Sequence, residues 1–201
     1  MGTAEASRAK AWKIAIRPQT LPAAAAPVVV GTGLAVRDGV FAPFPAVAAL
    51  VGASLIQIGT NLTNDYYDAV KGADTDESEG FTRVTQAGLI APERVRLGAA
   101  AAFGASMLVG LYLTYVGGAP ILAVGVLGIA SGIAYTAGPY PLGYHGLGDV
   151  FVFVFFGVVA VTGTYYVQAA AVLASPLPTT LPPGTVPVEA VVASLPIAGI
   201  S

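Results

Sequence analysis

Five long apolar runs dominate this sequence and limit what it can fold into. They lie at about residues 21–36, 40–60, 97–116, 119–136 and 150–174. Each comes close to the roughly 20 residues that a helix needs to cross the hydrocarbon core of a bilayer. Only 10% of the residues are charged and 55% are hydrophobic, whereas about a quarter of the residues are charged in soluble domains. We therefore predict an all-α, multi-pass transmembrane helical bundle with five complete helices.

A sixth apolar run begins at Val188 and has about 14 residues where the sequence ends. That length is too short to span a membrane comfortably. We therefore interpret residues 1–201 as a single membrane-embedded domain that is truncated at its C-terminus. Glycine and alanine are frequent in the apolar runs, and such small residues let membrane helices pack closely. This composition favours a packed bundle over independent membrane anchors.

The positive charges predict how the helices are oriented. Eight of the nine Lys and Arg residues would share one side of the membrane: Arg8, Lys10, Lys13, Arg17, Lys71, Arg83, Arg94 and Arg96. Only Arg37 would lie on the other side. Because cytoplasmic segments of membrane proteins carry the excess of Lys and Arg, we place the N-terminus and the 61–96 segment in the cytoplasm, together with 138–149. The proline-rich segment 175–187 would then lie outside.

A polar stripe marks the end of the second predicted helix. Asn61, Asn64, Asp65 and Asp68 follow the spacing i, i+3, i+4, i+7 and so share one helical face. An Asp exposed to lipid at the centre of a helix costs about 2.5–3.5 kcal/mol. The stripe should therefore face a cavity or the cytoplasmic interface.

The acids of the stripe suggest a cation site, although acids in loops often only solvate a helix end. Carboxylates one turn apart repel one another, and a further acid, Asp74, follows in the same stretch. Because the chain has no Cys and one His, a metal would be bound by oxygen atoms, which suits Mg²⁺ completed by substrate phosphates. Arg83 and Gln86, spaced i, i+3, could act beside it. Arg83 suits bidentate binding of phosphate, and the alternative is that it is a cytoplasmic anchor.

A second segment on the predicted cytoplasmic side, 134–157, is rich in Gly and Pro. This composition is typical of turns. The segment carries Tyr135, Tyr140, Tyr144 and a single acid, Asp149. Tyrosines are also common as interfacial anchors, and an acid suits the first turn of a helix. Both a site and a structural role therefore remain open for these residues.

Several blocks of the sequence resemble one known family. They are RPQTLPAAAAPVVVGT at 17–32, NLTNDYYDAVKGAD at 61–74, RVTQAGLI at 83–90, YTAGPYPLGYHGLGDVFVFVFFG at 135–157 and TYYVQ at 164–168. On these blocks the chain resembles the UbiA-type intramembrane aromatic prenyltransferases, and within them the 1,4-dihydroxy-2-naphthoate polyprenyltransferases of menaquinone synthesis. The wider superfamily places an Asp where this chain has Gly72; the naphthoate branch is similar to this chain in placing it at Asp74.

The resemblance implies a set of site residues and a larger fold. It assigns Mg²⁺ to Asn64, Asp68 and Asp74, and it implies nine helices and a second aspartate-rich motif after the sixth helix, beyond this chain. With it we assign catalytic roles to Asn64, Asp68, Asp74, Arg83, Gln86, Tyr135, Tyr144 and Asp149. Substrate-binding roles are assigned to Arg17, Asn61, Asp65, Lys71, Arg83 and Tyr140.

The resemblance also implies a reaction and a location. A polyprenyl group would pass from polyprenyl diphosphate to 1,4-dihydroxy-2-naphthoate, giving demethylmenaquinone with release of diphosphate and CO₂. The protein would lie in the cell membrane, with both substrates and the lipid bilayer as partners and no nucleic acid. Other aromatic acceptors, such as 4-hydroxybenzoate, remain alternatives. A membrane transporter is an alternative from a different class, although the acids lie at helix ends and in loops rather than at the midplane, where transporter sites form.

Overall fold

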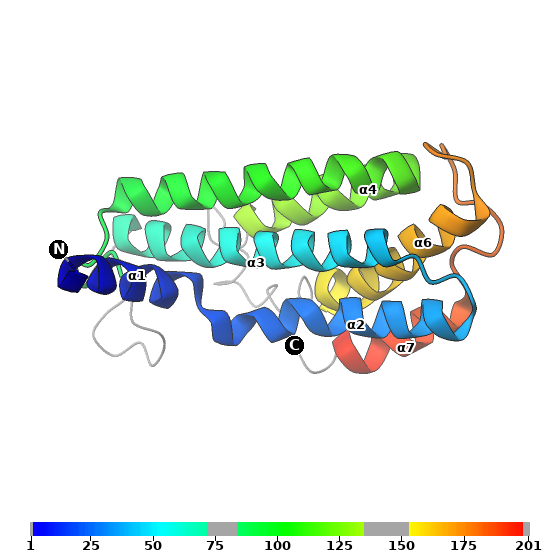
Figure 1. Cartoon of the computed structure of the whole chain (residues 1–201), viewed down its shortest axis with the longest axis horizontal. Coiled ribbons are helices and arrows are strands. Elements are labelled where there is room, and N and C mark those ends of the chain that lie inside the picture. Colours follow the sequence, from blue (N-terminus) through cyan, green and yellow to red (C-terminus); the bar gives the residue numbers. More distant parts are fainter. Residues whose placement is uncertain (1, 72–83, 135–152, 199–201) are drawn as a thin grey trace.

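A computed structural model describes residues 2–71, 84–134 and 153–198, and within these ranges every regular element is a helix. Figure 1 shows long helices running side by side along one axis. The elements are α1 (Gly2–Ile16), the 3₁₀ turn η1 (Pro18–Thr20), α2 (Leu21–Arg37), α3 (Pro43–Lys71), α4 (Pro92–Ala134), the π-helical segment η3 (Phe153–Val159), α6 (Ala160–Leu173) and α7 (Val188–Ala198). The predicted all-α bundle is confirmed.

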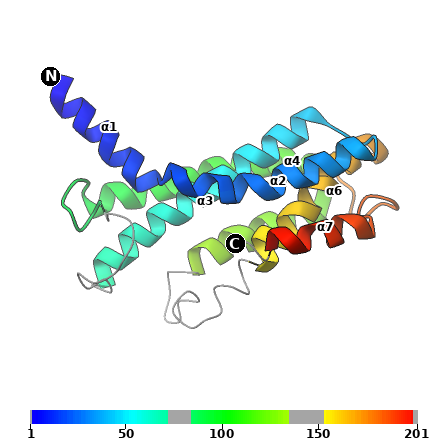
Figure 2. The ribbon, with the colours of Figure 1, turned by 90° about the horizontal axis from the view of Figure 1, so that it is seen from below.

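Four helical stretches are long and apolar enough to cross a membrane. They are Ser7–Arg37, Pro43–Val70, Pro92–Ser131 and Phe153–Leu173. The third contains two of the predicted helices, because α4 is broken at Gly118, whose φ of 68° and ψ of −154° are not helical. In Figures 1 and 2 the part of α4 after this break turns back along the part before it. Helices are therefore present in all five predicted membrane segments, over the residues that the structure describes.

The turn inside α4 requires glycine at residue 118. Its φ lies in the left-handed region that disfavours a Cβ atom, and a Cβ built there would lie 1.7 Å from the carbonyl oxygen of Pro178. The segment between α6 and α7 packs directly on this turn, since the Ala119 N–H donates to the same Pro178 oxygen at 3.1 Å. From α6, the Tyr166 hydroxyl donates to the Gly117 carbonyl at 2.7 Å. Hydrogen bonds from two further segments thus hold the hairpin.

Helix α1 was not predicted from the sequence. Its basic residues keep it out of the apolar runs, but Ala11 and Ala15, one turn apart, are buried and pack against the end of α3. Figure 2 shows α1 leaving the axis of the other helices. Its apolar and polar residues do not separate into two faces, so no helical period marks α1 in the sequence.

Three apolar clusters hold the described helices together. One joins α1, α3 and the start of α4 through Ala11, Ala15, Leu62, Val84, Ile90, Val95 and Ala99. A second joins α2, α6 and α7 through Ala35, Val40, Tyr165, Ala169 and Ala190. A third joins the middle of α4 to α6 through Ile121, Tyr166, Val167 and Ala170. Large apolar side chains also cover the outside, with Phe44 78% and Leu108 70% exposed, as expected of a surface that meets lipid.

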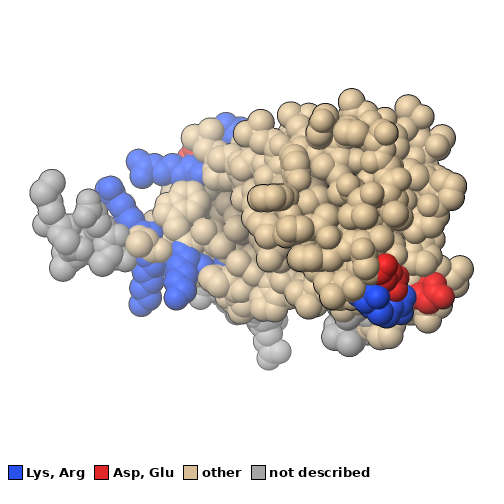
Figure 3. Space-filling model, turned by 45° about the vertical axis from the view of Figure 1, so that its right-hand side comes forward, with Lys and Arg blue, Asp and Glu red and all other residues tan. Residues whose placement is uncertain are grey.

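Charged residues gather at the ends of the molecule. In Figure 3 the uncharged flank separates a group of Lys and Arg near α1 from a small group at the other end. Arg37, at the end of α2, belongs to the second group, where it pairs with Asp38. This separation agrees with the predicted distribution of cations, while the identity of the cytoplasmic side remains a prediction.

Candidate functional site

The polar stripe at the end of α3 lies inside the protein. Asn61, Asp65 and Asp68 are 4%, 1% and 4% exposed, and Asn64 is half-buried. The neighbouring Leu62 belongs to the apolar cluster with α1 and the start of α4, so apolar packing and polar contacts hold this end of α3 together. The stripe avoids lipid, as the cost of exposing its carboxylates there requires.

Asp65 binds the turn that precedes α4. Its carboxylate accepts the Val84 N–H at 3.0 Å and the Thr85 N–H at 3.2 Å, and it also accepts a hydrogen bond from the Thr85 hydroxyl. That hydroxyl lies 3.0 Å from the Asp65 carbonyl oxygen as well. Hydrogen bonds to an ionised carboxylate are about twice as strong as neutral ones. Asp65 therefore fixes residues 84 and 85 against the stripe. The sequence pattern did not indicate this role, and a substrate contact at Asp65 stays a prediction.

Asn61 ties the stripe to the elbow between α1 and α2. Its Nδ2 donates to the Ile16 carbonyl and to the Thr20 Oγ1, each at 2.9 Å. Between them lies Arg17, which is 7% exposed and has a φ of 55°. A left-handed conformation costs a non-glycine residue about 1–2 kcal/mol. The fold thus holds Arg17 at the elbow that Asn61 contacts, which brings two predicted substrate-binding residues into one region.

Gln57 extends the stripe by one further turn. Its Nε2 donates to Thr20 Oγ1 at 3.3 Å and to Asn61 Oδ1 at 3.4 Å, while its Oε1 is buried without a hydrogen-bond partner. A buried acceptor left without a donor costs about 1–3 kcal/mol. Gln57 was not among the predicted site residues because a neutral amide does not indicate a cation site, although its i, i+4 spacing to Asn61 was visible in the sequence.

The other predicted residues are placed as follows. Asn64 and Asp68 lie on the stripe, Lys71 is the last residue of α3, and Gln86 is exposed in the turn before α4. Six predicted residues fall outside the described ranges: Asp74, Arg83, Tyr135, Tyr140, Tyr144 and Asp149. Within residues 2–71, 84–134 and 153–198, no three His, Cys, Asp or Glu side chains gather as a metal site. The set of three proposed metal ligands is therefore untested.

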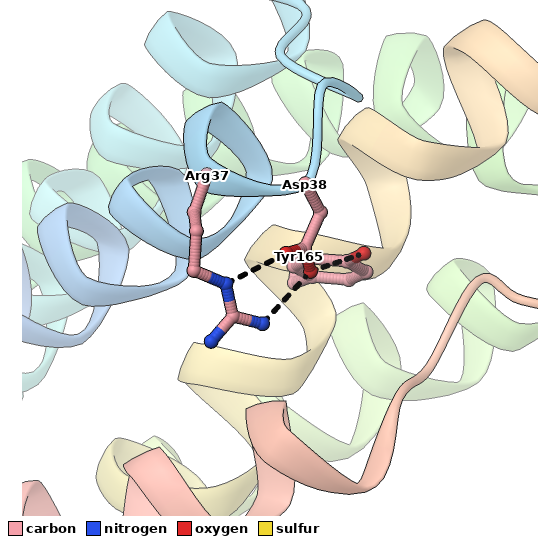
Figure 4. Close-up of polar contacts among 3 residues, drawn as sticks. All are labelled: Arg37, Asp38 and Tyr165. Atoms are coloured by element: carbon pink, nitrogen blue, oxygen red, sulfur yellow. Dashed lines mark hydrogen bonds and ion pairs between the residues drawn. The ribbon is translucent and has the colours of Figure 1, made fainter.

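A separate polar cluster lies at the opposite end of the bundle, shown in Figure 4. Arg37 donates to Asp38 from Nε at 2.6 Å and from an amino group at 3.1 Å, and the Tyr165 hydroxyl of α6 donates to Asp38 at 3.0 Å. The hydrogen bond from Arg37 lowers the pKa of Asp38, helped by the one from Tyr165 and opposed by partial burial. The cluster fastens α6 to the end of α2.

Comparison with known proteins decides the family. The model of the UbiA prenyltransferase family matches residues 24–198, nearly the whole chain. The chain belongs to the UbiA prenyltransferase family. Among its relatives, proteins named 1,4-dihydroxy-2-naphthoate octaprenyltransferase are 43% identical in Escherichia coli, over 81% of this chain and 55% of the relative, and 42% identical in Mycobacterium tuberculosis, over 80% and 55%.

The same family reaches vertebrates. A zebrafish (Danio rerio) protein named UbiA prenyltransferase domain-containing protein 1 is 30% identical over 85% of this chain and 51% of its own length. The chain thus spans about half the length of the UbiA relatives that it matches. The matched region contains α3 with its polar stripe and the turn that Asp65 holds.

Proposed function

We propose that this member of the UbiA family takes part in the transfer of a polyprenyl group from polyprenyl diphosphate to 1,4-dihydroxy-2-naphthoate. The observation that carries the proposal is the match to relatives named for this reaction, at 42–43% identity over about four fifths of the chain. The buried stripe of α3 supports it, because carboxylates kept inside a membrane protein mark functional sites.

The donor set at the stripe fits Mg²⁺. Asn64 and Asp68 stand one helical turn apart on α3 and offer an amide and a carboxylate oxygen, and Asp74 would add a third ligand. Mg²⁺ prefers oxygen ligands and usually keeps waters and substrate phosphates, so few protein ligands suffice. When bound, Mg²⁺ would neutralise the charge that collects on the departing diphosphate.

The residues of the chain then position the two substrates. The carbon–oxygen bond between prenyl C1 and the diphosphate breaks, and the electron-rich ring forms a new carbon–carbon bond to C1. The ring then loses its carboxylate as CO₂, and the electrons of the bond between the ring and the carboxylate carbon return to the ring. The overall reaction therefore needs no added proton. Asp65 holds residues 84 and 85 beside the stripe, and Arg83, which precedes them in the sequence and lies outside the described residues, is the side chain that we propose for the diphosphate. A guanidinium suits phosphate oxygens.

The location is proposed on the distribution of charge. The Lys and Arg residues near α1 lie at the end of the bundle where α3 carries its stripe (Figures 1 and 3), and cationic ends face the cytoplasm. Substrates that carry diphosphate or carboxylate groups would then enter from the cytoplasm, with the polyprenyl tail among the helices of a cell membrane.

The test is product analysis. The protein, expressed from its complete gene and reconstituted in liposomes, is given polyprenyl diphosphate and 1,4-dihydroxy-2-naphthoate labelled in its carboxylate. We expect prenylated naphthoquinol and labelled CO₂ in equal amounts. Prenylation of 4-hydroxybenzoate in preference to the naphthoate would replace the acceptor that we propose, and the absence of any prenylated product would remove the function.

A further inference from the structure

We infer that Gln57 Oε1 accepts a hydrogen bond from a ring hydroxyl of the aromatic substrate. The inference rests on the proposed function, since it names a contact for the acceptor of that reaction. It starts from the one side chain of the stripe whose buried oxygen lacks a hydrogen-bond partner.

A chain of hydrogen bonds fixes which end of the Gln57 amide is the oxygen. Asn61 donates to the carbonyl oxygen of Ile16, so the atom that Asn61 turns toward Gln57 must be its oxygen. Thr20 uses its own hydroxyl proton on the carbonyl oxygen of Arg17 at 2.9 Å, so its oxygen can only accept from Gln57. Both neighbours therefore require the NH₂ group of Gln57 on their side. The buried atom on the other side is an acceptor.

The position of Gln57 suits a ligand bound beneath the diphosphate. Because successive residues of a helix are about 100° apart around its axis, Gln57 lies within about 20° of both Asn64 and Asp68 on the surface of α3. Asp65 lies at a larger angle from each of them. A rise of 1.5 Å per residue puts it about 10 Å deeper in the bundle than Asn64. An aromatic acceptor that extends along α3 from the diphosphate by this length would reach the level of Gln57. The side chain is also held in place, since its NH₂ group bonds two different elements.

The chemistry of the substrates selects the hydroxyl group. An amide oxygen can only accept, so its partner must donate. The diphosphate and the ionised carboxylate offer only acceptors, and the prenyl tail offers neither donor nor acceptor. The ring hydroxyls are the donors that the two substrates supply. A fixed acceptor at this depth would therefore favour an acceptor ring with a hydroxyl at the matching position.

The experiment compares three ligands: 1,4-dihydroxy-2-naphthoate, 1-hydroxy-2-naphthoate and 4-hydroxy-2-naphthoate. Their dissociation constants are measured on the protein expressed from its complete gene, in the wild type and in Gln57→Leu. We expect the wild type to bind the monohydroxy analogue that lacks the hydroxyl bound by Gln57 about tenfold more weakly than the diol, because one hydrogen bond is lost. In Gln57→Leu that preference should vanish, while the KM for polyprenyl diphosphate stays within about twofold.

Gln168→Leu is the matched control. Like Gln57, Gln168 has a buried Oε1 without a partner, although its whole side chain is buried, and it donates to Thr32 and to the Thr164 carbonyl away from the stripe. It should keep the wild-type preference among the three ligands. Gln57→Met replaces Gln57→Leu if the leucine variant does not fold, because methionine is unbranched and adapts to irregular space.

Two results would overturn the inference. Equal binding of all three ligands by the wild type would show that the protein binds neither ring hydroxyl. An unchanged preference in the Gln57 variant would show that Gln57 does not bind the hydroxyl, and that a buried water is the partner of its Oε1. Prenyl transfer by the same wild-type preparation shows in either case whether the proposed function itself stands.

Discussion

The Asp65 carboxylate accepts the backbone N–H of Thr85 from twenty residues away, and the Thr85 hydroxyl returns to the same side chain. Asp65 therefore positions the turn before α4. Asp68, one turn nearer the end of α3, is also buried and stays the metal ligand that we propose, because the resemblance assigns Mg²⁺ to it.

Replacing Asp65 should loosen that turn. In Asp65→Asn an NH₂ group faces one of the two backbone N–H groups, so one of the hydrogen bonds to Val84 or Thr85 is lost. We expect a loss of about 1.5–3 kcal/mol in the free energy of unfolding, the usual range for hydrogen bonds to a charged group. Thermal unfolding in detergent measures it. Glu93→Gln, an exposed acid in the first turn of α4, is the control and should change stability by less than about 0.5 kcal/mol. Equal stability of both variants would contradict the anchoring role.

Glycine at residue 118 should be irreplaceable. Gly118→Ala places a Cβ against the Pro178 carbonyl and forces a left-handed φ on alanine, so we expect a loss of more than about 2 kcal/mol and a lower yield of folded protein. Gly104→Ala and Gly125→Ala are matched controls in the same helix, since a Cβ there meets nothing within 4 Å. They should be neutral or gain up to about 1 kcal/mol. A stable Gly118→Ala variant would mean that α4 does not turn at this residue.

The Asp38–Tyr165 contact should make stability depend on pH. Because the pKa of Asp38 is lowered below 3.8 in the folded protein, its stabilisation is complete above the unfolded pKa and is lost as the pH falls through it toward the lower folded value. Tyr165→Phe should therefore unfold at a lower temperature than the wild type at about pH 7, and the gap should narrow toward about pH 3.

Tyr166→Phe provides the control for this pH dependence. It loses a hydrogen bond to the Gly117 carbonyl, which does not titrate, so its gap from the wild type should be the same at both pH values. A constant gap for Tyr165→Phe as well would show that Asp38 does not carry the effect.

The distribution of cations predicts the topology. A reporter that works only in the cytoplasm should be active when fused after Arg83 or Tyr144 and silent after Arg37 or Thr180. Opposite results at Arg83 and Tyr144 would place the two segments on different sides of the membrane, and the shared site that we propose could not form.

The sequence was sufficient for some parts of this account and insufficient for others. The membrane helices and the stripe on α3 could be predicted because apolar length and helical period are local properties. The break between 116 and 119 was also visible in the sequence, as a gap between two apolar runs. The contact of Gly118 with Pro178 could not be predicted, because Pro178 is sixty residues away. The role of Asp65 was hidden for the same reason, because its partners at 84 and 85 belong to another segment. Gln57 was missed because a neutral side chain draws attention only when its hydrogen bonds are known.

The central claim is that the stripe of α3 binds the diphosphate through Mg²⁺ at Asp68. The most direct measurement is the rate of polyprenyl transfer to 1,4-dihydroxy-2-naphthoate by Asp68→Asn in liposomes, at several Mg²⁺ concentrations, with membrane insertion checked in the same samples. We predict full insertion and a rate at least about a hundredfold below that of the wild type at every Mg²⁺ concentration, a loss of about 2.7 kcal/mol or more in transition-state stabilisation. A correctly inserted Asp68→Asn protein that keeps more than about a tenth of the wild-type rate, a cost below about 1.4 kcal/mol, would contradict the claim.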